Sequence, residues 1–195
     1  VLNYNGKSYI IEIRLKGDWS DHLLGNKWSY RISIKNGESF LGMKSFSIQD
    51  PKTRGFMHEW VLHQLFKKED VLTTRFHFIP VSVNGSHAGV YALEEHFEKQ
   101  LVESNKRREG VIVKLDEEAL WEQRAYSKYK EEHDKSGDLA YEAAEIKPFK
   151  EKKTRKKDAL SKQFLIAQNL LHKYKIGAPN ASEYIDVDRL AKAYA

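Results

Sequence analysis

The sequence contains no cysteine, only four prolines among its 195 residues, and no long apolar run. The absence of cysteine excludes disulfide bonds and thiolate ligands for a metal. No apolar run approaches the roughly 20 residues that a membrane-spanning helix needs. What remains is the composition of a globular chain, because 41% of the residues are hydrophobic and 12% are aromatic.

The charge of the chain is moderately basic, with a formal net charge of +5 and an isoelectric point near 9.1. This balance favours an anionic partner such as a nucleotide, a nucleic acid or an acidic protein. The first residues, VLNYNGKSYI, lack an initiator methionine and the basic head and apolar stretch of a signal peptide. Because they begin close to a strand, we expect this chain to be a fragment of a longer protein.

The N-terminal third has the alternation of half-buried strands. The runs YIIEIRL (9–15) and WSYRISI (28–34) alternate with period two, and a short strand is expected at 44–49. Asp50-Pro51 then opens a helix predicted over 53–68. The side chains expected to line its buried face are Phe56, Met57, Trp60, Val61, Leu65 and Phe66. His58, Glu59, His63 and Lys67 are expected to fall largely on the opposite, polar side.

A hairpin follows this helix. RFHFIPVSV (75–83) and AGVYALE (88–94) are joined through Asn84-Gly85, which is among the strongest short-range hairpin signals. Two carboxylates, Glu94 and Glu95, stand where the second strand gives way to a short helix predicted over 96–105.

The remainder is mostly helical in propensity. A strand-like run (109–116) precedes a densely charged helical segment (117–145), and residues 147–157 hold seven basic residues in eleven, which favours a solvated linker or mobile loop. A helix over 159–175, with an apolar stripe, and a final helix with Asp186 as N-cap complete the chain. We therefore predict an α+β fold, with a small sheet lobe before a helical lobe.

This order of elements is also that of a protein-kinase N-lobe passing into its C-lobe, although the GxGxxG, VAIK, HRD and DFG signatures are missing. Three stretches resemble the CotH (spore coat protein H) kinase-like family. They are IRLKGDWSDHLLGNKWSYRISI, FLGMKSFSIQDPKTRGFMHEWVLHQLF and FIPVSVNGSHAGVYALEEHFEK. The last contains an Asn-Gly hairpin followed by Gly-x-Tyr-x-x-x-Glu. YIDVDRLAKAYA resembles the helix that opens the C-terminal half of that family.

The resemblance implies a protein-kinase-like N-lobe, a small antiparallel sheet plus one helix, at 1–95. It implies a hinge, a charged helical insertion and the start of a truncated, mainly helical C-lobe at 96–195. It also implies an atypical ATP-dependent protein kinase that uses Mg²⁺ or Mn²⁺ and acts on a protein substrate. The catalytic aspartates and metal ligands of the family would lie beyond residue 195, so we expect this fragment alone to be inactive. By family analogy the location is extracytoplasmic, in a cell envelope or spore coat.

A nucleotide site needs backbone N–H groups and a fixed cation near the phosphates. Gly17 and Ser20 are candidates for the phosphate loop, because glycine permits close backbone approach and serine adds a hydroxyl donor. Asp18 sits awkwardly there, and an ordinary β-turn explains the same residues. Arg31 is preferred over Lys27 as the strand cation because it lies within the apolar alternation; either would otherwise be a surface charge.

The acid that holds this cation is predicted to be Glu59, on the helix after the sheet, against the alternative of a solvated helix face. His58 and His63 are expected to be surface or boundary residues. Glu95 aligns with the family's glutamate and is our preferred ligand for ribose or adenine at the hinge, although Glu94 and Glu95 could equally stabilise the next helix. Lys114 is a further, weaker candidate.

Two other functions remain open. Ser33 stands where the family often has a lysine, which keeps a catalytically inactive kinase-like scaffold of a bacterial envelope or coat in play. The basic tract 147–157 would suit an anion-binding or nucleic-acid-binding module. However, it carries one aromatic residue, Phe149, and no stacking platform, so nucleic acid is the disfavoured partner.

Overall fold

The structure is a computed structural model that describes residues 1–16, 25–119, 122 and 144–195. The chain divides into two compact units, Val1–Glu109 with Lys192–Ala195, and Gly110–Ala191. The placement of a lobe boundary after residue 95 stays a prediction.

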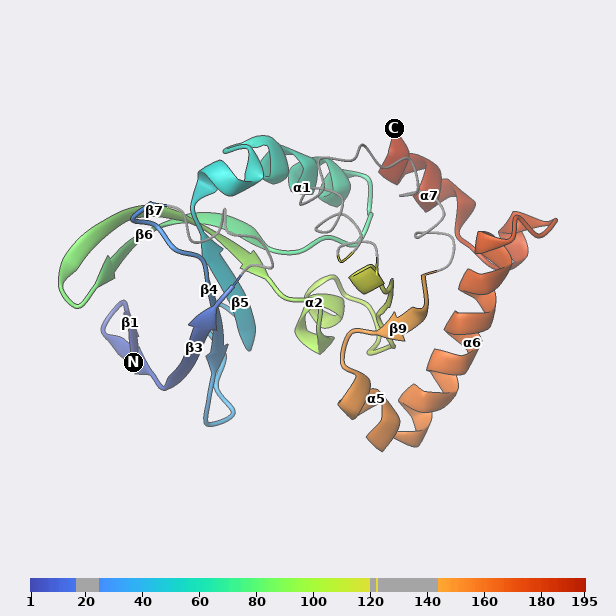
Figure 1. The fold of residues 1–195 in the computed structure, drawn as a ribbon, viewed down its shortest axis with the longest axis horizontal. Coiled ribbons are helices and arrows are strands. Elements are labelled where there is room, and N and C mark those ends of the chain that lie inside the picture. Colours follow the sequence, from blue (N-terminus) through green and yellow to red (C-terminus); the bar gives the residue numbers. More distant parts are fainter. Residues whose placement is uncertain (17–24, 120–121, 123–143) are drawn as a thin grey trace. The chain divides into compact units, whose positions relative to one another are not determined.

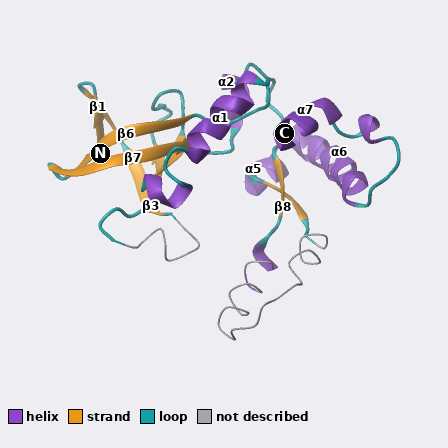
Figure 2. Cartoon of the chain, turned by 90° about the horizontal axis from the view of Figure 1, so that it is seen from above, coloured by secondary structure: helices purple, strands orange, loops and turns teal. Residues whose placement is uncertain are grey.

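The first unit contains the predicted small antiparallel sheet and one packed helix, and the α+β class is confirmed (Figure 1). The five-stranded sheet has the order β3-β4-β5-β7-β6, and all neighbouring strands are antiparallel. Its strands are β3 (Ile11–Leu15), β4 (Tyr30–Ile34), β5 (Ser45–Gln49), β6 (Phe76–Val83) and β7 (Ser86–Glu95). Helix α1 (His58–Lys68) lies beside this sheet and contacts β6 (Figure 2).

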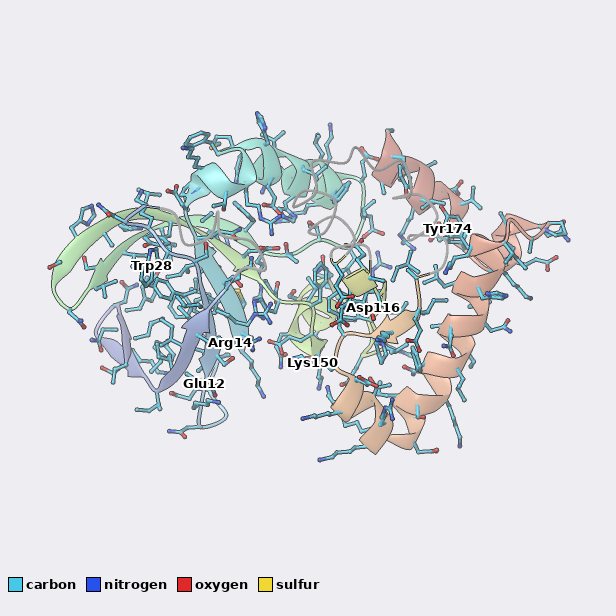
Figure 3. The ribbon with its side chains drawn as sticks, in the orientation of Figure 1. Glu12, Arg14, Trp28, Asp116, Lys150 and Tyr174 are labelled. Atoms are coloured by element: carbon cyan, nitrogen blue, oxygen red, sulfur yellow. The ribbon has the colours of Figure 1, made fainter. Side chains whose placement is uncertain are left out.

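The two faces of the sheet differ sharply in chemistry. One face is apolar and forms the core, with Ile32, Phe46, Ile48 and Leu93 buried together. Directly paired residues on neighbouring strands share a face. The register Arg14–Arg31–Ser47–Glu94 therefore runs across the opposite face, which we call the polar face. Arg14 and Glu12 can be followed on β3 in Figure 3.

A small hairpin that the sequence pattern did not predict precedes the sheet. Strands β1 (Leu2–Tyr4) and β2 (Lys7–Tyr9) pair around Asn5-Gly6, both of which have positive φ angles. Tyr9 packs edge-on against Phe40 in the core. The predicted strand over 9–15 is thus divided between β2 and β3. Because β3 is an edge strand, its apolar side chains further along, Ile13 and Leu15, are exposed.

Helix α1 begins later than the sequence predicted. A short 3₁₀ helix, η2 (Pro51–Arg54), is capped by Asp50 and followed by Gly55 and Phe56 with φ angles of 61° and 59°. Two left-handed residues in succession break the helical path. The α-helix therefore starts at His58, not at Thr53.

The predicted buried face of α1 is also wrong. Phe56, at 60% exposure, is open to solvent, as are Met57, Val61 and Leu65. The inward side instead carries Glu59 and His63 together with half-buried Trp60 and Phe66. The reason is that neighbouring segments carry polar partners for Glu59 and His63. The helix can therefore turn these two side chains inward without leaving them unpaired.

The second unit corrects the interpretation of 147–157 as a linker. Strand β9 (Ile146–Pro148) pairs with β8 (Val113–Leu115), and α5 (Glu151–Lys156) packs against α6 (Asp158–Lys175). The tract folds because Ile146, Pro148 and Thr154 are buried. Its cations face outward or, like Lys147, pair with a carboxylate.

The remaining elements are α2 (Lys99–Ser104) in the first unit, η3 (Ala181–Glu183), and α7 (Val187–Tyr194). Asp186 accepts a hydrogen bond from the Arg189 backbone N–H, 3.1 Å away, which confirms the predicted N-cap. Most of the helical segment predicted over 117–145 lies outside the described residues. Within the part of the chain that the structure describes, no helix has the length and apolarity to cross a bilayer.

The core face of β7 gives a test of this fold. Leu93→Ala removes a side chain that is 0% exposed, and we expect the free energy of unfolding to fall by about 2–5 kcal/mol because a cavity is left. Val90→Ala, in an exposed position of the same strand, is the matched control and should cost about 1 kcal/mol or less. Urea denaturation measures both; equal losses would contradict the assignment of faces.

Candidate functional site

Four charged side chains and one amide, from five segments, meet on the polar face, beside α1. We call this set the polar-face cluster. Its members are Lys16 after β3, Gln49 at the end of β5, Arg54 from η2, Glu59 from α1 and Glu94 from β7. All five belong to the first unit.

Lys16 is the buried cation of this cluster, with a side chain 14% exposed. Its Nζ donates to Gln49 Oε1 and to Glu94 Oε2, each at 3.0 Å. Burial lowers the pKa of Lys16 below its ordinary value, and the nearby Arg54 and Arg31 act in the same direction; the carboxylate of Glu94 opposes them. Glu94 is therefore the group that opposes the effect of burial on the pKa of Lys16.

Arg54 is the more accessible cation, with 39% of its side chain exposed. Its Nε lies 3.5 Å from Glu59 Oε2, and one of its terminal nitrogens lies 4.0 Å from Glu94 Oε2. A guanidinium carries five N–H donors in a fixed fork. These two long contacts leave donors that are able to take a further oxygen ligand.

Glu59 is the carboxylate on the helix. Burial acts to raise its pKa, but its interaction with His63 and the charges of Arg54 and Lys16 outweigh this effect, so the pKa lies below its ordinary value. Its Oε2 is buried and accepts no hydrogen bond among the described residues. Its contact with Arg54 is an ion pair without a hydrogen bond, so the two side chains can separate at little cost.

The charges of the five members balance, because Lys16 and Arg54 supply two positive charges against the two carboxylates Glu59 and Glu94. Arg31 lies near enough to influence Lys16. Charges in a partly buried group act on an incoming anion more strongly than the same charges in water would. The arrangement can hold a phosphate through Arg54 while the carboxylates keep both cations in place.

Glu95 is placed elsewhere, in the core. It pairs with Phe46 across β5 and β7, and it is 1% exposed. Its carboxylate accepts three hydrogen bonds from Arg75, from the backbone N–H at 3.2 Å, from Nε at 2.9 Å and from a terminal nitrogen at 2.5 Å. Arg75 also donates to the carbonyls of Leu41 and Gly42. Glu95 therefore fixes the loop before β5 to the start of β6, and it does not face the cluster.

The two predicted strand cations are not brought together. Arg31 lies on the polar face, directly across from Ser47 and close to Lys16. Lys27 is half-buried, with Nζ 3.3 Å from the Val90 carbonyl oxygen and 6.0 Å from the centre of the Tyr91 ring. The sequence pattern predicts alternation from Trp28, but β4 begins at Tyr30, so the strand does not reach Lys27.

The other predicted residues are less informative for this site. Gly17, Asp18 and Ser20 lie outside the described residues. Lys114 belongs to the second unit, where its Nζ lies 5.9 Å from the centre of the Phe149 ring. Near it, Asp116 (Figure 3) pairs with Lys147 at 2.5 Å.

Sequence reasoning missed Lys16, Gln49 and Arg54. A signal existed for Lys16, because it has the same parity as Glu12 and Arg14 on the polar side of the first strand. No comparable signal existed for Arg54, whose position depends on the left-handed turn that follows it.

A divalent cation has no evident site among these residues. The described ranges contain no group of three or more histidine, aspartate or glutamate side chains that would hold a metal ion. The carboxylates of the cluster are already paired with Lys16 and Arg54. The residues of the cluster thus do not fit Mg²⁺.

The first unit thus combines a small antiparallel sheet with a helix whose carboxylate, Glu59, contacts Arg54 of η2. The model of the CotH kinase protein family matches residues 13–195, so the chain belongs to this family, as its sequence motifs predicted. A search of curated proteins found no match to the chain.

Because Glu95 is buried in the core, we expect the protein to be less stable when its charge is removed. Glu95→Gln removes the charged acceptor of a half-buried arginine, and we expect the free energy of unfolding to fall by about 2–3 kcal/mol. Glu103→Gln, which breaks an exposed ion pair with Lys99, is the control and should cost less than about 1 kcal/mol. Similar losses in the two variants would argue against a structural role for Glu95.

The dependence of Lys16 on Glu94 predicts a change of pKa. In Glu94→Gln the opposing carboxylate is gone, so burial should lower the pKa of Lys16 still further. The Lys16 ¹³Cε signal, followed by NMR as the pH is raised, measures this. Glu12→Gln, whose own partner is Lys35 on the outer strands, should leave the Lys16 pKa as in the wild type. An unchanged or raised value in Glu94→Gln would contradict the pairing.

Proposed function

We propose that this chain is the nucleotide-binding portion of an atypical ATP-dependent protein kinase of the CotH family. The observation that carries the proposal is the polar-face cluster: a buried lysine and a half-exposed arginine held between a helix carboxylate and a strand carboxylate. Phosphoryl transfer needs fixed positive charge near the phosphates, and kinases use a lysine on the sheet paired with a glutamate on the helix to supply it.

In this proposal Arg54 and Lys16 have different roles. Arg54, the more exposed cation, contacts phosphate oxygens directly through its planar fork. Lys16 lies deeper and adds positive charge from behind. Glu59 and Glu94 orient the two cations, and Arg31 contributes to the same positive field. This assigns Arg31 and Glu59 to the site the sequence predicted for them, and it gives the leading positions to Lys16 and Arg54.

The base of the nucleotide is proposed to lie at the end of β7. Residues 96–98 connect this strand to α2, and a kinase-like domain binds the adenine edge through its connecting segment. Glu94 is on the polar face at this point, whereas Glu95 is in the core. We therefore assign contact with the ribose or the adenine amino group to Glu94, and we regard the glutamate of the family motif, Glu95, as structural.

The finer properties follow from the family and are proposed with it. They are a protein substrate, a divalent metal such as Mg²⁺ or Mn²⁺ bound by other residues together with the nucleotide, and a location in the cell envelope or spore coat. Gly17 and Ser20 remain the proposed phosphate loop.

One observation favours the alternative of an inactive scaffold. Lys16 is buried, and both of its acceptors, Gln49 and Glu94, belong to the protein itself. A cluster that satisfies itself in this way also stabilises the face of a sheet with no ligand. The two functions differ in one measurable property, which is whether ATP binds.

We expect the protein to bind ATP, and Arg54→Ala to weaken binding by about 10–100-fold, the value of one or two charge-assisted hydrogen bonds. Isothermal titration calorimetry at fixed ionic strength measures the affinity. Arg155→Ala, which removes an exposed arginine paired with Glu151 in the second unit, is the control and should bind like the wild type. Absence of ATP binding in the wild type, with or without a divalent metal, would favour the scaffold.

A further inference from the structure

His63 occupies the junction between α1 and the segment before β6. Its Nδ1 contacts Thr73 Oγ1 in a short hydrogen bond, and its Nε2 lies 3.3 Å from Thr74 Oγ1. The ring stacks on Phe76, with ring centres 5.3 Å apart. These contacts hold the imidazole in one orientation, with 13% of the side chain exposed. The sequence pattern predicts His63 only as a surface or boundary residue and gives no indication of this role.

The same Nε2 faces Glu59, one turn earlier on α1. The distance from Nε2 to Glu59 Oε1 is 3.8 Å, which is longer than a hydrogen bond. The other oxygen of Glu59 lies 3.5 Å from Arg54 Nε, also without a hydrogen bond. Glu59 thus stands between two nitrogen donors and is fully bonded to neither.

The charge of the imidazole sets how strongly it attracts Glu59, whose Oε1 faces the ring while its Oε2 faces the guanidinium of Arg54. A neutral imidazole has one N–H, and a protonated imidazole has an N–H at both nitrogens. Threonine hydroxyls can donate or accept, so Thr73 and Thr74 accommodate either state. A carboxylate only accepts, so Glu59 is the neighbour that distinguishes the two states. Histidine is also the side chain that ordinarily changes charge between pH 5 and 8.

We propose that His63 is a proton-sensitive positioning residue: when its imidazole is charged, with a proton on both nitrogens, it draws the Glu59 carboxylate toward Nε2 and weakens the contact of that carboxylate with the guanidinium of Arg54, which then turns to an incoming anion. When the imidazole is neutral, Glu59 remains the counter-ion of Arg54. Protonation also adds one positive charge to the cluster. Both effects strengthen the binding of phosphate groups as the pH falls.

A second imidazole lies on the polar face away from α1: His96 Nε2 is 2.7 Å from Ser47 Oγ, and Ser47 pairs with Glu94 across the sheet. Among the described residues, Glu59 is the ionisable side chain that contacts the ring. Arg54 and Lys16 stand behind Glu59, on η2 and after β3, and the charges of both lower the pKa of Glu59. Lys67, one turn further along α1, is exposed to solvent.

NMR of the protein between pH 8 and pH 5 tests the redistribution directly. We expect the ¹³Cδ signal of Glu59 and the ¹⁵Nε signal of Arg54 to pass through one shared transition. His63→Gln, which keeps an amide donor but cannot gain a charge, should abolish it. His58→Gln, at the exposed start of the same helix, is the matched control and should retain it. If His63→Gln does not fold, Glu59→Gln replaces it, and the Arg54 transition should then disappear.

The consequence for binding rests on the proposed function and is measured separately. The ratio of ATP affinities at pH 6 and pH 8 should be at least about threefold larger in the wild type than in His63→Gln. Comparing the two proteins cancels the effect of pH on ATP itself, because that effect is the same in both. No ATP binding, with the shared transition present, would overturn the proposed function and leave the role of His63 intact. An Arg54 signal that does not respond, or one that responds equally in His63→Gln, would overturn the role of His63.

Discussion

The alternation of side chains along β7 is the constraint on which the site depends. Glu94 and Glu95 are adjacent in sequence, so a strand places them on opposite faces of the sheet. One carboxylate faces the cations of the polar face, and the other is held in the core by Arg75. Two identical side chains therefore take different roles only because neighbouring residues of a strand point to opposite faces. A shift of one residue in the register with β5 would bury the wrong carboxylate and disrupt both.

Helix α1 is arranged around polar contacts. Burying a carboxylate is costly unless it is paired, and Glu59 is compensated by Arg54 and His63. The same helix leaves Val61 and Leu65 at its exposed side. In a helix held by hydrogen-bonding and ionic partners, small changes of protonation or ligand have more influence on its side chains than in one held by apolar packing.

The apolar sheet face could be predicted from the sequence, whereas the polar contacts of α1 could not. Period-two alternation predicted β4, β5 and the hairpin of β6 and β7 well, because burial on one face is a strong local signal. The inward face of α1 was predicted wrongly. Its polar partners, Thr73 and Thr74, lie about ten residues further along the chain, and no pattern within the helix indicates that they contact it. Asn5-Gly6 carries the same turn signal as Asn84-Gly85, but the strands beside it are too short to show alternation. The positions of Arg54 and of the segment 147–157 depend on tertiary partners that no local pattern reveals.

Gly42 shows that the constraint extends to the loop before β5. Its φ angle is +77°, and a Cβ added there would lie 2.6 Å from a terminal nitrogen of Arg75. Any side chain at this position would displace that nitrogen, which donates to the Leu41 carbonyl, and so disturb the guanidinium that holds Glu95. Positions 42, 75 and 95 come from three separate segments, yet they are free to vary only together. In divergent sequences of this fold, the loss of that glycine would therefore mark chains in which the whole arrangement has been replaced.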